Sequence, residues 1–156
     1  MHQNERLIHG FYTCFQKLDA NGMAECYAPD ALFSDPVFPR LEGKDVEAMW
    51  HMLAHRARNF TLTFRDVSAD DARGSAHWEA TYLFSKTGRT VTNIIDAEFE
   101  FRHGLIVRHI DRFDFWRWSR QALGVGGALF GWTAMLRNAV RREASKGLAQ
   151  FIASRK

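Results

Sequence analysis

The stretch Tyr27-Ala-Pro-Asp-Ala-Leu-Phe-Ser-Asp35-Pro36 decides the fold of this chain. A helical pattern before it breaks at Pro29, and the apolar residues Leu32 and Phe33 predict an extended segment. Proline disfavours helical backbone at the residue before it, so we expect Asp35 on extended backbone or in a turn. A carboxylate at the end of an aromatic-flanked apolar run is a candidate base for proton transfer.

Helical periodicity lies on both sides of this stretch. Apolar residues at helical spacing predict a helix over residues 4–18, a short helix over about 22–27 and a third helix over about 44–57. After Trp116 the helical period returns, with a glycine-rich break at residues 124–127.

Alternation of apolar and polar residues, typical of strands, occupies the middle of the chain. It predicts strands over residues 60–64, 76–84, 91–101 and about 105–115. The strands are long and the turns between them short, so the predicted sheet is antiparallel. Helices, then a meander of strands, then helices indicate an α+β fold with helices on one sheet face.

Composition indicates one ordinary globular domain. The chain has 156 residues, of which 46% are hydrophobic and 25% charged. No secretory leader is recognised, and Cys14 and Cys26 lack metal-ligand spacing, so we expect a cytoplasmic protein with reduced thiols. The longest uncharged stretch, residues 122–136, is too short to span a membrane.

The positive charge is concentrated at the C-terminal end. Residues 117–156 hold eight basic residues against one acid, a net charge of +7, and the rest has 13 against 17, a net charge of −4. Three interpretations of this positive charge are open: a solvated helix face, contact with the acidic body of a second subunit, and contact of the C-terminal helix with a membrane surface. Nucleic acid is not expected as a partner, because no reading motif accompanies the charge.

The order of elements resembles the NTF2-like fold, and SnoaL-like and ketosteroid-isomerase-like proteins in particular. The match covers roughly residues 4–116, and its most specific pieces are residues 27–36, 41–46 and 94–111. The resemblance implies an NTF2-like cone, in which a bent antiparallel sheet wraps around the N-terminal helices, with an extra C-terminal helix.

The resemblance also implies the domain organisation and the partners. Residues 1–116 would form the SnoaL-like domain, and residues 117–156 a basic helical extension that packs on the same domain or on a partner subunit. A homodimer, a small hydrophobic ligand and no cofactor are implied.

Three carboxylates are candidate catalytic residues by this resemblance. Asp35 matches the isomerase base, and Asp96 matches the protonated acid that donates a hydrogen bond to the enolate oxygen. Asp111 lies in a place comparable to the late-strand acid of SnoaL-like cyclases. The positions that match pocket or wall residues are Tyr27, Trp50, Trp78 and Phe113.

The chain departs from the resemblance at two positions. Cys14 aligns with the tyrosine that serves the isomerase's oxyanion hole, and a thiol is a weak donor. Tyr12 lies about 200° away around the helix and is not expected to substitute for it. Ile94 stands where epoxide-hydrolase-like members have an arginine, which disfavours that chemistry.

Each candidate acid also has a purely structural interpretation. Asp35 could cap a turn or the next helix, and Asp96 could pair with Arg108 or Arg112 on the neighbouring strand.

The last strand offers an acid–base pair. His109 and Asp111 share a strand phase with Phe113, so all three face the same side, where His109 and Asp111 form either an acid–base pair or a salt-bridged rim. His77 and Glu79 lie on the face opposite Trp78 and are expected at the solvent or an interface.

No metal site is expected. His51 and His55 have helical i, i+4 spacing, but no third ligand accompanies them.

Two functions follow from these residues. One is a proton-transfer enzyme, an isomerase or cyclase, that acts on a small hydrophobic carbonyl compound in an apolar pocket. The other is a non-catalytic module that binds a small molecule or another protein.

Overall fold

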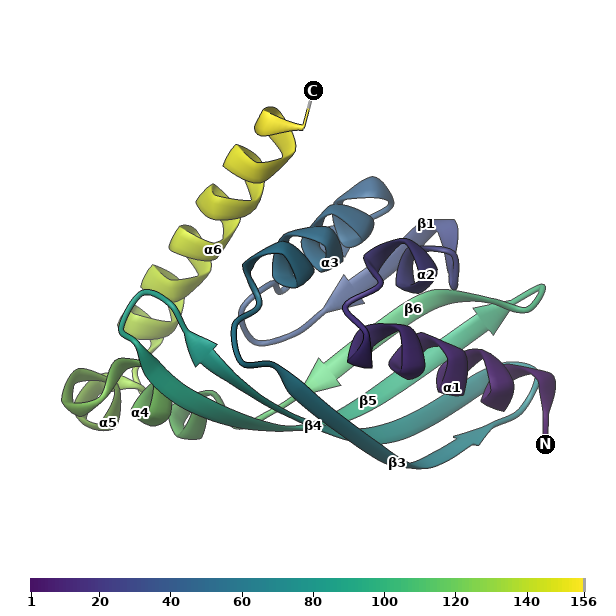
Figure 1. Cartoon of the computed structure of the whole chain (residues 1–156), viewed down its shortest axis with the longest axis horizontal. Coiled ribbons are helices and arrows are strands. Elements are labelled where there is room, and N and C mark those ends of the chain that lie inside the picture. The colour runs from purple at the N-terminus through teal and green to yellow at the C-terminus, as the bar shows by residue number, and fades with distance from the viewer. Residues whose placement is uncertain (156) are drawn as a thin grey trace.

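The computed structural model describes residues 1–155, which form one bent sheet with helices on its concave side (Figure 1). Three helices belong to the N-terminal part: α1 (Gln3–Gln16), α2 (Ala20–Ala24) and α3 (Lys44–Arg56). Six strands form the sheet. β1 (Tyr27–Ser34) and β2 (Leu41–Glu42) lie between α2 and α3 in the chain, and β3 (Thr61–Ala69), β4 (Arg73–Phe84), β5 (Arg89–Arg102) and β6 (Leu105–Arg112) follow α3. Three helices end the chain: α4 (Phe115–Leu123), α5 (Val125–Phe130) and α6 (Ala134–Ser154). The predicted α+β cone is confirmed.

The sheet is mixed, which corrects the prediction of an antiparallel sheet. Its strand order is β2-β1-β6-β5-β4-β3, and β3 to β6 form the predicted antiparallel meander. β1, however, runs parallel to β6. No short turn joins these two strands, so turn length does not fix their relative direction.

The core lies between the concave face of the sheet and helices α1 and α3. Alternate residues of β5 are buried, and α1 contributes an apolar stripe. The inner face of the strand and the apolar face of the helix therefore both belong to the core. A register shift in β3 between Arg65 and Ser68, with Asp66 at positive φ, marks a bulge, a feature that bends strands. The buried α1 residues are Asn4, Ile8, Phe11, Tyr12 and Phe15.

The C-terminal helices pack on the rest of the described chain. β6 ends at Arg112, three residues earlier than expected, because Asp114 caps α4 by accepting a hydrogen bond from the Arg117 amide. α4 covers part of β5, and α6 lies beside α3, where the buried Leu148 joins the main core. No helix within residues 1–155 combines the length and the apolar character that a membrane span needs.

Candidate functional site

Five buried side chains form a continuous hydrogen-bonded chain through the aromatic core. Trp50 Nε1 donates to the Tyr27 hydroxyl at 2.9 Å, and that hydroxyl lies 2.7 Å from His109 Nδ1. His109 Nε2 lies 2.9 Å from Asp111 Oδ1, which also accepts a hydrogen bond from Trp78 Nε1 at 3.3 Å. Both His109 and Asp111 are almost fully buried, at 0% and 3% exposure. The predicted acid–base pair on β6 therefore lies inside the core, and a solvent-exposed rim is excluded.

One placement of the protons satisfies the donors and acceptors of these five hydrogen-bonded side chains. Indole nitrogen only donates, so the Tyr27 hydroxyl accepts from Trp50 and has its own proton for His109 Nδ1. In this arrangement His109 accepts at Nδ1 and donates its Nε2 proton to Asp111. With this placement, every buried side-chain nitrogen of these five residues has a hydrogen-bond partner.

The sheet register brings these residues together. Tyr27 begins β1 and Phe33 lies opposite His109, so both strands present aromatic rings to one side. Ala97 on β5 lies opposite Asp111. Its side chain is only a methyl group, so the Trp78 indole of β4 reaches across β5 to the Asp111 carboxylate.

Asp35 lies in the turn after β1, as the sequence predicts. Its Oδ1 accepts hydrogen bonds from the amides of Val37 and Phe38 at 2.7 and 2.6 Å. Burial raises the pKa of Asp35 to about 7, and the charge of Asp111 adds to the rise, whereas the two amides and the nearby Arg141 oppose it. The two carboxylates are therefore electrostatically coupled, and Asp35 is balanced between its neutral and ionised forms near neutral pH.

Three polar atoms close to this centre have no hydrogen-bond partner among residues 1–155. They are the second carboxylate oxygens of Asp35 and Asp111 and the buried hydroxyl of Tyr12. Burial raises the pKa of Tyr12 well above its usual value, and the charge of Asp111 contributes. The Tyr12 hydroxyl is buried, and buried polar groups are normally paired, so it is the atom that a bound ligand or water would satisfy.

Tyr12 is a candidate site residue, although it was not expected from the sequence to substitute for the oxyanion tyrosine. It lies four residues after Ile8 and next to Phe11, on the buried stripe of α1, so the helical period contained the signal. Cys14 instead faces α2, where burial, followed by the neighbouring Asp19, raises the pKa of its thiol. The tyrosine that reaches the interior from α1 is therefore Tyr12, and Cys14 plays no part in this centre.

Asp96 lies on the outer face of the sheet, which corrects the expectation of a buried acid. The odd-numbered residues 91–99 of β5 are buried, so the even-numbered Asp96 points outward and is exposed. It lies 2.9 Å from His77 Nδ1, and His77 Nε2 lies 2.8 Å from Glu79, on the solvent side as predicted. Neither arginine predicted as a partner of Asp96 contacts it: Arg112 contacts Glu98 at 3.2 Å, and Arg108 contacts Glu100 at 3.6 Å.

Aromatic side chains fill the space where an apolar pocket was predicted. Tyr27, Trp50 and Trp78 are buried in the main core, and Phe113 is partly buried between the two apolar clusters. Two hollows of about 470 and 340 Å³ lie elsewhere, and neither is lined by Asp35 or Asp111. Both include residues of α3: the larger is shared with α6, and the smaller with the start of α2. Within residues 1–155, no group of three His, Cys, Asp or Glu side chains is arranged to hold a metal ion.

The C-terminal helices contact the surroundings of Asp35. From α6, Arg141 Nε donates to the carbonyl of Pro36 at 2.9 Å. From α4, Trp118 Nε1 donates to the Tyr82 hydroxyl at 2.9 Å. Burial raises the pKa of Tyr82 to about 12, and the charge of Asp35 adds to this rise. No role at the site was expected from the sequence for residues 117–156.

Solved structures share this fold. IdmH from Streptomyces antibioticus, a proposed polyketide cyclase, is 24% identical, with a TM-score of 0.65 over 80% of this chain and 100% of that one. An LEH-like epoxide hydrolase from M. tuberculosis is 19% identical, with a TM-score of 0.66 over 81% of this chain and 94% of that one. A Catenulispora acidiphila protein with a ketosteroid-isomerase-like fold, in complex with trimethylamine, is 11% identical, with a TM-score of 0.67 over 81% and 96%. At these identities the likeness shows the fold alone.

Sequence comparison identifies the family. No curated protein matches the chain significantly. The family model of the SnoaL-like domain, however, matches residues 8–109, from α1 to the histidine of the buried pair. The chain therefore belongs to the SnoaL-like domain family.

Proposed function

We propose that this protein is a proton-transfer enzyme, an isomerase or cyclase, that acts on a small hydrophobic carbonyl compound. The observation that carries the proposal is the pKa of Asp35, which burial and the Asp111 charge raise to about 7. A general base works best when its pKa lies near the working pH, because it then accepts and returns a proton at similar free energies. The second oxygen of Asp35 has no protein partner within residues 1–155 and is free to meet a substrate.

The other residues of the centre have complementary roles. Asp35 would remove a proton from the carbon next to the carbonyl, the electron pair of that C–H bond would form a C=C bond, and the π pair of the carbonyl would move to its oxygen, while the Asp35 carboxyl holds the proton and later returns it. The resulting enolate oxygen needs a hydrogen-bond donor, and the unpaired hydroxyl of Tyr12 is the candidate. Asp111, fixed by His109 and Trp78, would keep the negative potential that raises the pKa of Asp35.

Turnover of a panel of enolisable ketones by the variant Asp35→Asn tests the proposal. Asparagine keeps the oxygen that accepts the two turn amides, so the fold is retained while the base is lost. We expect a loss of about 100- to 10,000-fold in kcat. The variant Asp96→Asn is the matched comparison, because this carboxylate lies on the outer face, and it should keep its turnover. Equal turnover by Asp35→Asn and the unmodified protein would remove Asp35 from the mechanism.

A second candidate function is a binding module without turnover. The observation that favours it is that two hollows lie away from the two carboxylates, so a molecule held in either would not meet Asp35 or Asp111. Under this alternative, ligands bind with the same affinity to the unmodified protein and to Asp35→Asn, and no ketone of the panel is converted by either.

A further inference from the structure

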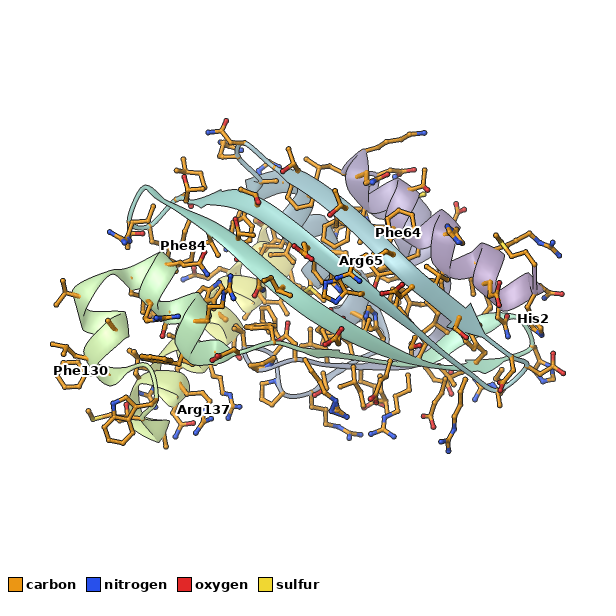
Figure 2. All side chains as sticks on the ribbon, turned by 90° about the horizontal axis from the view of Figure 1, so that it is seen from below. His2, Phe64, Arg65, Phe84, Phe130 and Arg137 are labelled. Atoms are coloured by element: carbon orange, nitrogen blue, oxygen red, sulfur yellow. The ribbon has the colours of Figure 1, made fainter. Side chains whose placement is uncertain are left out.

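The end of the molecule formed by α5 and the start of α6 displays large apolar side chains to solvent. Five residues within an eleven-residue stretch are more than half exposed, and we call them the apolar tip: Val125 at 76%, Leu129 at 59%, Phe130 at 51%, Trp132 at 73% and Met135 at 73%. Both views place α5 at one extremity of the long axis, and Figure 2 shows Phe130 projecting away from the body there. Folded proteins rarely gather so many large apolar side chains on one exposed segment unless something binds it.

The local fold holds these side chains outward. Gly127 and Gly131 press against Ser119 of α4, and a Cβ atom at either glycine would collide with it. These two glycines therefore face the protein, while Val125, Leu129 and Phe130 of α5 are exposed. The turn after α5 is fixed as well, because Trp132 Nε1 donates to the Leu129 carbonyl at 2.9 Å and Thr133 caps α6.

The charge around the apolar tip has one sign. Residues 115–142 contain no aspartate or glutamate, and they contain five arginines: Arg117, Arg120, Arg137, Arg141 and Arg142. None of these five forms an ion pair with a carboxylate of residues 1–155. Figure 2 shows Arg137 at the same extremity as Phe130. The tip thus lies in a segment whose only charged side chains are arginines, none of them in an ion pair with a carboxylate of residues 1–155.

We propose that the apolar tip docks on the surface of a membrane that contains anionic lipids. Trp, Phe and Leu side chains enter the boundary between headgroups and acyl chains, while neighbouring arginines attract anionic headgroups. The placement of the tip at an extremity lets it meet a flat surface without interference from the sheet. A second copy of the chain fits less well as the partner. A symmetric contact between two tips would bring the same arginines close to each other, and an asymmetric contact would build an open filament instead of a closed dimer.

Vesicle sedimentation with the full chain tests this docking. We expect the protein to sediment with vesicles of phosphatidylcholine and phosphatidylglycerol and to remain free with phosphatidylcholine alone, and added salt should weaken the binding. The double variant Phe130→Ser/Trp132→Ser should need at least tenfold more lipid for half-maximal binding. Its matched control is Leu53→Ser, which changes an exposed leucine of α3 that lies outside the tip.

A charge variant keeps the test independent of the apolar residues. Arg117→Gln/Arg137→Gln should weaken binding about fivefold for each arginine removed, whereas Arg65→Gln on the outer sheet face should not. Absence of binding to anionic vesicles by the unmodified protein, or binding that the apolar and charge variants leave unchanged, would overturn the proposal. Light scattering provides a further test. A dimer of the unmodified protein that is absent from the Phe130→Ser/Trp132→Ser variant would also overturn the proposal, because the tip would then be a contact between two copies of the chain.

Discussion

Replacing Asp35 by asparagine should make the protein more stable at neutral and alkaline pH. Burial raises the pKa of Asp35 from 3.8 to about 7, so the folded chain binds this proton more tightly than the unfolded chain does. Between about pH 4 and 7 unfolding releases the proton, and the free energy of unfolding falls as the pH rises through that window. Asparagine carries no such proton and keeps the turn's amide acceptor.

The size of the effect follows from the pKa of Asp35. A rise from 3.8 to about 7 is about 3 pH units, and each unit corresponds to about 1.4 kcal/mol. The maximum penalty for ionising Asp35 in the folded protein is therefore about 4 kcal/mol. The Asp35 side chain keeps partial contact with solvent, which reduces this value, so we expect about 2 to 4 kcal/mol above pH 8.

Urea unfolding of the unmodified protein and of Asp35→Asn at pH 4, 5, 6, 7 and 8 measures this difference. The variant should match the unmodified protein near pH 4 and gain stability steadily up to pH 8. Asp66→Asn serves as the control, since this carboxylate is exposed and lies on β3, away from the site. A difference between Asp35→Asn and the unmodified protein that stays constant within about 1 kcal/mol over the whole range would refute the reasoning.

Three further substitutions test the packing of the described chain. Tyr27→Phe removes the hydroxyl between Trp50 and His109 and should lower the free energy of unfolding by about 1 to 3 kcal/mol in urea titrations. Gly127→Ala should lower the melting temperature, because a Cβ there collides with α4, while Gly126→Ala, with nothing within 4 Å, should not. Leu148→Ala should cost about 2 to 5 kcal/mol if α6 is part of the core, and a loss below 1 kcal/mol would contradict its burial.

The sequence predicted most elements of the fold because their periods are strong. The helix of residues 44–57 and the alternation along residues 76–84 and 91–101 appear as α3, β4 and β5 with ends shifted by a few residues. β2 was missed, since two residues are too few to show a period. The parallel pairing of β1 with β6 was also missed, because contact between strands far apart in sequence leaves no local pattern.

The candidate site was predicted only in part. The shared phase of His109, Asp111 and Phe113 gave the buried acid–base pair, because Phe113 identified the inner face. Asp96 was assigned to the interior by the resemblance, although the alternation of apolar odd-numbered residues along the strand places an even-numbered residue on the outer face. The raised pKa of Asp35 could not be predicted from the sequence, since it depends on burial and on a carboxylate 76 residues away along the chain.

Docking of the apolar tip and proton transfer at Asp35 are connected through α6. This helix carries the tip residue Met135 in its first turn, and its Arg141 donates to the Pro36 carbonyl and lowers the pKa of Asp35. A contact that shifts α6 away from the turn would weaken that effect, so we expect the pKa of Asp35 to rise when anionic vesicles are added. The variant Arg141→Gln should raise it without vesicles, and NMR titration of the Asp35 carboxyl carbon measures both. A midpoint that neither the variant nor the vesicles move would show that the two regions act independently.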